Sequence, residues 1–297
     1  MRLPHYDNDV PRSQPVSTIP IIPDTPRRRY GALSDMLSGV RLIERRHPAA
    51  PSTAGNCNRF CDRWSADDIA QTLVETGAVA HWKRQGFHDI IVDIAPTMGH
   101  ARHAFDVWTT CENRSRELLV QVVVWLEDTY IDEFDVAIPT FCVEHLRLQT
   151  PNINPSNELL PGQDFPASGQ LRRIFGILQH WAICLQARAM TEIPEFFHTA
   201  YIFSRYFTYA DSGMESTFRA MCRDLLPPAN SSATRSDAES LQAAVARVSR
   251  AFEDGHIALA GAPYYWPTEL QIYPLDAELA RLLDRPIVPS QEVFRFL

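Results

Sequence analysis

The chain has 297 residues, of which 45% are hydrophobic and 22% charged, and a formal net charge of −8. This composition supports one large globular domain or two modest ones, and the acidic balance argues against broad nucleic-acid binding. We expect a cytoplasmic protein that binds neither nucleic acid nor a membrane. Its N-terminus has no signal-like apolar core, and its longest apolar run, at 118–126, has only the length of a strand.

The composition of residues 1–56 predicts a proline-rich, flexible arm. Eight of the 22 prolines fall in the first 51 positions, together with the basic triplet 27–29. Such a composition buries little surface and resists regular structure. A solvated triplet is the favoured interpretation, and an acidic partner is the alternative. Cys57 and Cys61 have CxxxC spacing, which is weak for zinc, so we expect reduced thiols and no metal.

The folded body is expected to begin near Ser65. Ser65 and Asp68 form a variant of the capping box, which predicts a helix that ends at Gly77. Strand composition follows at 88–95 and 104–110. A turn then leads to an apolar strand at 118–126, which predicts an antiparallel hairpin. A further strand is expected at 141–148.

The second half of the chain is dominated by helical patterns. The predicted helices are about 169–187, 194–207, 213–225, 236–253 and 276–283, with a strand at 256–260. The order of elements predicts a mixed α/β (α+β) fold in which helices flank a mostly antiparallel sheet. We therefore divide the chain into the arm 1–56, an α/β domain at 57–226, and a helical and strand extension at 227–297 packed on the same body.

The start of the helix near Ser168 has the pattern of an anion site. Arg172 and Arg173 lie in its first turn, where a cation costs roughly 0.3–1 kcal/mol because the free amides carry partial positive charge. A bound phosphate or pyrophosphate would offset this cost by accepting from the amides of Ser168, Gly169 and Gln170 and by pairing with the guanidinium groups. The alternative is that both arginines point to solvent or meet an acidic neighbour.

This stretch resembles the GNAT-type acyl-CoA N-acyltransferases. The strand Val143-Glu-His-Leu-Arg-Leu148, the turn Pro166-Ala-Ser-Gly-Gln170 and the helix 198–207 follow the family's order of a central strand, a pyrophosphate turn and a later helix. The resemblance covers roughly 65–210 and implies a GNAT-like fold. It departs from the family pattern in three ways. Gly169 is the only clear turn glycine, the loop from Gln149 to Phe165 is longer than the family's tight connection, and Ser204 stands where the family often has its acid tyrosine.

The resemblance implies acyl-CoA as cosubstrate, no metal, and transfer of the acyl group to an amine of a small molecule or peptide. Glu144 on the central strand would be the base, and Tyr206 or Tyr201 the acid that protonates the leaving thiolate. Residues expected to contact acyl-CoA are Leu146 and Leu148 through their main chain, and Gln163, Ser168, Gly169, Gln170, Arg172 and Arg173. An outward-facing Glu144 and core-packed tyrosines are the structural alternatives.

Three rival interpretations remain open. A non-catalytic acyl-CoA-binding or interaction module on the same fold would suit the loss of glycines. A metal hydrolase is the second interpretation, because His100 and His103 have HxxH spacing. No glutamate, however, stands at the position that metalloproteases use. Cys142 and His145 have the residue types of a thiol nucleophile and its base, but strand alternation predicts that they point to opposite faces.

Overall fold

The computed structural model describes residues 59–95, 102–110, 115–151, 159–163, 169–227 and 235–297, with the backbone alone at 235–240. The predicted arm at 1–56 lies outside these residues. The helices are α3 (Ala66–Glu75), α4 (Ala78–Arg84), α5 (Leu171–Cys184), α6 (Phe197–Phe203), α7 (Ser212–Leu225), α8 (Arg235–Glu253) and α9 (Ala277–Leu283). The longer strands are β1 (His88–Ala95), β2 (Arg102–Thr110), β3 (Arg116–Ile131) and β4 (Val136–Leu148). The shorter strands are β5 (Ala189–Glu192), β6 (Thr208–Tyr209), β7 (Ile257–Leu259), β8 (Ala262–Pro263), β9 (Gln271–Pro274) and β10 (Phe294–Phe296).

A seven-stranded sheet organises the molecule, in the order β1-β2-β3-β4-β5-β9-β6. Neighbouring strands are antiparallel except for β4 and β5, which run parallel. The predicted mixed fold with a mostly antiparallel sheet is therefore confirmed. Strand β9 belongs to the C-terminal segment 227–297 but lies between β5 and β6, so this segment completes the main sheet as well as packing on it.

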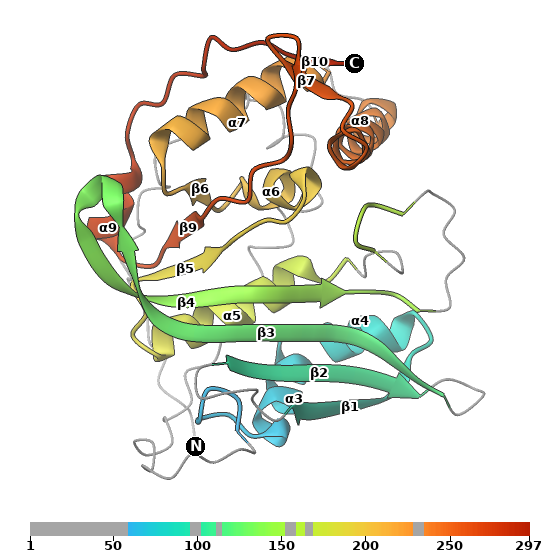
Figure 1. Cartoon of the computed structure of the whole chain (residues 1–297). Coiled ribbons are helices and arrows are strands. Elements are labelled where there is room, and N and C mark those ends of the chain that lie inside the picture. The colour runs from blue at the N-terminus through green and yellow to red at the C-terminus, as the bar shows by residue number, and fades with distance from the viewer. Residues whose placement is uncertain (1–58, 96–101, 111–114, 152–158, 164–168, 228–234) are drawn as a thin grey trace.

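Helices α3, α4 and α5 lie on one face of β1–β4 (Figure 1). Their apolar side chains and those of the strands form the first core cluster. Its largest fully buried members are Phe60, Trp82, Phe105, Phe141, Trp181 and Phe207. Among the described elements no helix covers the other face of these four strands, which we call the open face (Figure 1).

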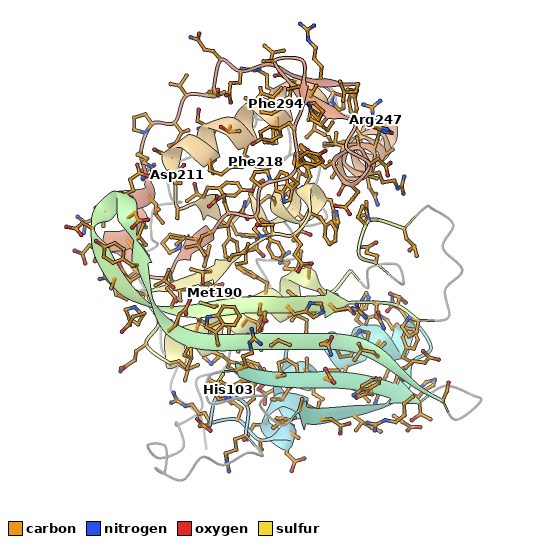
Figure 2. All side chains as sticks on the ribbon, in the orientation of Figure 1. His103, Met190, Asp211, Phe218, Arg247 and Phe294 are labelled. Carbon is orange, nitrogen blue, oxygen red and sulfur yellow. The ribbon has the colours of Figure 1, made fainter. Side chains whose placement is uncertain are left out.

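Two further clusters complete the core. The second core cluster joins α6, α7 and α8 to the small sheet β10-β7-β8, and includes Phe218 and Phe294 (Figure 2). The third lies around Ile272 of β9 and joins the far ends of β3 and β4 to α9. Met190 of β5 belongs to the first cluster (Figure 2). Strands β5, β9 and β6 therefore connect all three clusters.

Several local predictions are confirmed in detail. The Ser65 backbone N–H donates to Asp68 Oδ2 at 2.9 Å, and the Asp68 N–H donates to Ser65 Oγ at 3.2 Å, which completes the capping box of α3. Helix α5 buries its predicted apolar face, including Ile174, Leu178 and Trp181. No described helix has both the length and the apolar character that a membrane crossing needs.

Other local predictions need correction. The helix predicted at 194–207 is limited to α6, and the chain has already formed β6 by Thr208. Strands β5 and β9 were not predicted. They are four residues long and lie deep in the sheet, so they lack the alternation of polar and apolar residues that identifies a half-buried strand.

Candidate functional site

The two parallel strands β4 and β5 pair over only four residues. Their register runs from Thr140 opposite Ala189 to Val143 opposite Glu192. Strand β4 continues to Leu148 while pairing with β3 on its other side. Beyond Val143, no described strand pairs with the β5 side of β4. We call this stretch, from Glu144 to Leu148, the β4–β5 opening.

A β-bulge marks the start of this opening. On β3, the adjacent residues Val123 and Val124 pair with His145 and Val143, so Glu144 is the extra residue without a register partner. A bulge bends its strand and re-aims nearby side chains, and bulges are frequent beside active sites. Here the bulge coincides with the last residue pair between β4 and β5, so the strand changes direction where its parallel partner ends.

The N-terminus of α5 carries the predicted anion-binding residues. Gly169 has a left-handed φ of +68°, which favours glycine, and it precedes Gln170 at the N-cap. Gln170 is fully buried, and its Oε1 accepts from Arg173 Nη1 at 3.2 Å. The Gln170 side chain does not cap the helix, and its buried Nε2 has no hydrogen-bond partner in the described part of the chain.

The two predicted arginines differ in burial. Arg172 is 4% exposed, whereas Arg173 is half-buried. Arg172 lies near Tyr206, whose ring stacks on Phe175 of α5 with centroids 5.0 Å apart. Burial raises the pKa of Tyr206, while the nearby charges of Arg205 and Arg172 act in the opposite direction. The Tyr206 hydroxyl is therefore protonated at neutral pH.

The predicted catalytic residues lie in three separate places. Glu144 lies on the open face, where its carboxylate forms an ion pair with Arg102 Nε at 2.9 Å. Tyr206 packs against the first core cluster on the opposite, helix-covered face. Tyr201 is 4% exposed in the second core cluster, where its ring stacks on Phe197. The structure therefore does not bring Glu144 together with either tyrosine, and their catalytic roles stay predictions.

Of the remaining predicted contact residues, two lie in the opening. Leu146 and Leu148 are half-buried in β4, and their side chains pack against the first core cluster. Gln163 closes its own turn, because its N–H donates to the Leu160 carbonyl at 3.0 Å and its Oε1 accepts from the Leu160 N–H at 3.3 Å. Ser168 lies outside the described residues.

The bulge also shows that Cys142 and His145 do not point to opposite faces, contrary to what strand alternation alone predicts. Their partners on β3, Trp125 and Val123, are two residues apart, so both side chains lie on the open face despite their spacing of three. The Cys142 thiol is nevertheless a poor nucleophile. It accepts from Thr191 Oγ1 at 2.9 Å, and burial raises its pKa.

A row of buried polar residues, which the sequence does not predict, lies beside the opening. Glu192 of β5, Gln271 of β9 and Tyr209 of β6 are in register across three adjacent strands. Burial raises the pKa of Glu192 well above its ordinary value, and it also raises that of Tyr209. No sequence signal identifies this row, because its members come from strands of two and four residues.

The metal hypothesis has no geometric support in the described part of the chain. His100 and Cys57 lie outside it, the His103 ring meets Phe60 edge-on, and no group of three metal-ligating side chains occurs among the described residues. Burial raises the pKa of the Cys61 thiol well above its ordinary value. No protein-family model matches the chain, and no curated protein matches its sequence.

Proposed function

We propose that this protein binds acyl-CoA and transfers its acyl group to an amine of a small molecule or peptide. The observation that carries the proposal is the parallel pair β4 and β5, which ends at the Glu144 bulge. The next helix, α5, carries Gln170, Arg172 and Arg173 at its N-terminus. In parallel α/β arrangements, ligands bind where the carboxyl ends of strands separate.

The unpaired edge of β4 suits the pantetheine arm of acyl-CoA. An extended chain can bind a strand edge through main-chain hydrogen bonds, as an added strand does. Such bonds would come from the backbone of Leu146 and Leu148, as the sequence interpretation expects. Pantetheine contains two amide groups in an extended chain, so it has the donors and acceptors that an unpaired strand edge needs.

The N-terminus of α5 suits the diphosphate. Its free amides and helix dipole attract an anion, and a guanidinium group can pair with phosphate oxygens. Gln170 contributes a second and independent feature, because its buried Nε2 is a donor without a partner among the described residues. A phosphate oxygen would satisfy that donor.

The chemistry requires an acid for the leaving thiolate. In acyl transfer, the amine nitrogen attacks the thioester carbonyl, the carbon–sulfur bond breaks, and the thiolate takes a proton. Tyr206 suits this role, because it lies near Arg172 on the α5 side of the sheet and stays protonated at neutral pH. The Glu144 carboxylate is held by Arg102 on the other face, which weakens its case as the base.

A non-catalytic acyl-CoA-binding module is the alternative. The separation of Glu144 and Tyr206 on opposite faces of the sheet favours it, because acid and base must both reach the reacting atoms. Release of free thiol from acetyl-CoA in the presence of mixed amines distinguishes the two functions. Binding without thiol release would identify the module.

Calorimetric titration with CoA tests the shared binding site. We expect the Arg173→Glu variant to bind CoA at least about tenfold more weakly than the wild type, since it loses a charge-assisted phosphate contact. Arg281→Glu makes the same charge change on an exposed residue of α9 and should leave the affinity unchanged. Absence of binding heat up to about 5 mM CoA would contradict the proposal.

A further inference from the structure

Three polar residues form a continuous buried row beside the β4–β5 opening. Glu192 is opposite Gln271, and Gln271 is opposite Tyr209, so the three side chains project from the same face of adjacent strands. Gln271 and Tyr209 are fully buried, whereas Glu192 remains 8% exposed. The row is therefore reached from the Glu192 end. That end is also opposite Val143, the last residue of β4 before the opening.

The polar atoms of this row are poorly satisfied. Glu192 Oε1 is buried without a hydrogen-bond partner among the described residues. The Gln271 amide group and the Tyr209 hydroxyl face each other, and this contact opposes the rise that burial causes in the pKa of Tyr209, but no hydrogen bond of good geometry joins them. Buried polar groups in proteins almost always have a partner, and leaving one unsatisfied costs roughly 1–3 kcal/mol. Such a concentration in one row indicates a polar ligand group or ordered water between them.

The charge of the row indicates which ligand it suits. No ion pair among the described residues involves Glu192. A buried carboxyl group without a cation beside it holds its proton, and it attracts a cation that can enter. The row offers a cation three acceptors, which are a carboxyl oxygen, an amide oxygen and a phenol oxygen, while the Gln271 Nε2 donor faces the Tyr209 oxygen.

We propose that Glu192, Gln271 and Tyr209 bind the primary amine of the acceptor as an ammonium ion. The assignment to the acceptor rests on the proposed acyltransferase function, while amine binding itself does not. An ammonium group is about the size of a water molecule and has three N–H donors for three acceptors. A quaternary ammonium ion has no N–H donor, so it would leave these acceptors unsatisfied.

The proton balance of this site is simple. A neutral amine that enters takes the proton of the Glu192 carboxyl group, so no net charge enters the protein. In the reaction, the Glu192 carboxylate takes that proton back, and the nitrogen lone pair attacks the thioester carbonyl. The carbon–sulfur bond then breaks, and the nitrogen loses a second proton, which restores the acid that has protonated the thiolate. The thiolate that leaves is protonated by a separate acid. Glu192 therefore replaces Glu144 as the base in this scheme.

Nuclear magnetic resonance of the free protein tests the amine site. Protein labelled with carbon-13 at the glutamate carboxyl groups is titrated with acid and base, and the Glu192 signal is assigned from the Glu192→Gln variant. We expect n-butylammonium chloride to lower the pKa of Glu192 by at least about one unit, a tenfold change in proton affinity. n-Butanol has a similar chain without the charge and should leave this pKa unchanged.

Two variants complete the test. Tyr209→Phe removes only the hydroxyl group and should weaken n-butylammonium binding about three- to tenfold. Glu195→Gln changes an exposed carboxyl group three residues from Glu192 and should have no effect on binding. Circular dichroism of each variant confirms that the fold is retained.

The outcomes separate this inference from the proposed function. An unchanged Glu192 pKa in n-butylammonium overturns the amine site and identifies the row as a water site only, even if CoA binds. A lowered Glu192 pKa without any CoA binding supports the amine site and contradicts the acyl-CoA proposal alone.

Discussion

Buried polar side chains in this protein are of two kinds. Glu215 accepts from the Tyr209 N–H at 2.9 Å and pairs with Arg219 at the same distance, so its buried charge is fully engaged. Glu192 lies in the same region without such partners. Because both carboxyl groups are buried, the difference between them is the cation. A protein that retains an unpaired buried carboxyl group bears a stability cost, which is typical of a binding or catalytic residue.

His198 gives the clearest pH dependence of a single residue. It is 5% exposed, its Nδ1 lies 2.8 Å from Ser249 Oγ, and burial lowers its pKa to about 4. The unfolded chain binds a proton on this residue below about pH 6.5, whereas the folded chain does not until about pH 4. The neutral histidine therefore contributes stability that is lost as the pH falls from 6.5 towards 4.

Urea unfolding at pH 7 and pH 5 checks this contribution. Between these values the wild type should lose about 2 kcal/mol more stability than His198→Gln, which keeps a polar partner for Ser249 but does not titrate. An equal loss in both proteins would contradict a neutral buried His198.

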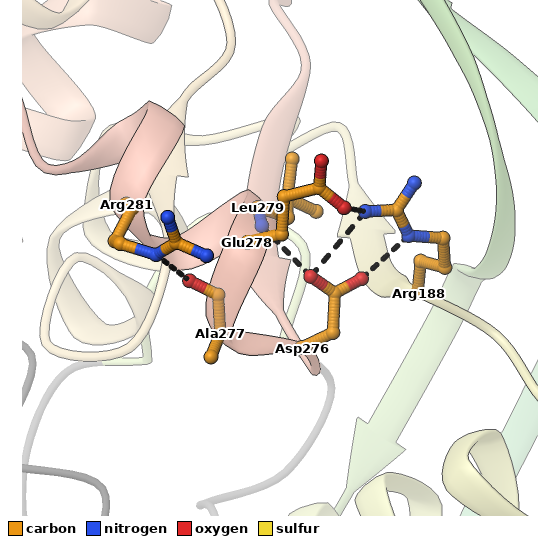
Figure 3. A network of polar contacts seen from close by, with 6 residues as sticks. All are labelled: Arg188, Asp276, Ala277, Glu278, Leu279 and Arg281. Atoms are coloured by element: carbon orange, nitrogen blue, oxygen red, sulfur yellow. Dashed lines mark hydrogen bonds and ion pairs between the residues drawn. The ribbon is translucent and has the colours of Figure 1, made fainter.

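At the scale of elements, an ion-pair network fixes the start of β5 to α9. Arg188 pairs with Asp276 and with Glu278, and Asp276 also caps α9 by accepting the Leu279 N–H at 2.8 Å (Figure 3). We expect Asp276→Ala to cost about 1–2 kcal/mol, because it loses the cap and the ion pair together.

The neighbouring glutamate provides a matched control for that measurement. The side chain of Glu278 is 69% exposed, so its ion pair with Arg188 is screened by solvent. Glu278→Ala should therefore change the free energy of unfolding by less than about 0.5 kcal/mol. If both variants cost the same in urea unfolding, the cap at Asp276 contributes nothing.

The described turn at 159–163 contains a glycine in a left-handed conformation. Gly162 has a φ of +73°, and an added Cβ would lie 2.6 Å from Phe196 Cε2. Gly77 has a similar φ of +76° and nothing within 4 Å. Gly77→Ala should cost about 1–2 kcal/mol from backbone strain alone, and Gly162→Ala about 1–3 kcal/mol more because Phe196 must move.

Thermal and urea unfolding of both glycine variants check this difference. The double variant Gly162→Ala, Phe196→Leu replaces the ring with a shorter side chain. It should recover part of the added loss of stability, since the clash is with the end of the Phe196 side chain. Equal destabilisation by the two single variants would show that Phe196 moves aside freely.

The elements differ in how well the sequence predicts them. Helix α3 follows from Ser65 and Asp68, because a capping box is a local signal whose hydrogen bonds span only three residues. Strand β5 does not follow from its sequence, because its position depends on pairing with β4 and β9 far along the chain. The Glu144 bulge is also set by cross-strand register, so strand alternation alone placed Cys142 and His145 on different faces.

The candidate site shows the same limit. The start of α5 at Arg172 and Arg173 was predicted from local sequence, and the structure has the helix N-terminus there. The row of Glu192, Gln271 and Tyr209 requires three strands separated by up to 79 residues to align (271 less 192). No local pattern contains that information.

At the scale of the whole molecule, β9 connects the two halves of the structure. It lies between β5, which joins the first core cluster, and β6, which leads into α7 and the second. Ile272 of β9 is fully buried and pairs with both Thr191 and Thr208. A substitution at Ile272 should therefore destabilise both the β5 side, with the first core cluster, and the β6 side, with the second.

Hydrogen exchange gives the test of this connection. Ile272→Ala should lower the protection of slow amides in α5 and in α7 by the same amount, about 2–5 kcal/mol, because the cavity destabilises one cooperative unit. Leu282→Ala, at a residue that is 43% exposed in α9, should cost less than about 1 kcal/mol in either helix. Loss of protection in α7 alone would mean that the C-terminal half opens independently, since β9 would then transmit nothing to the first core cluster.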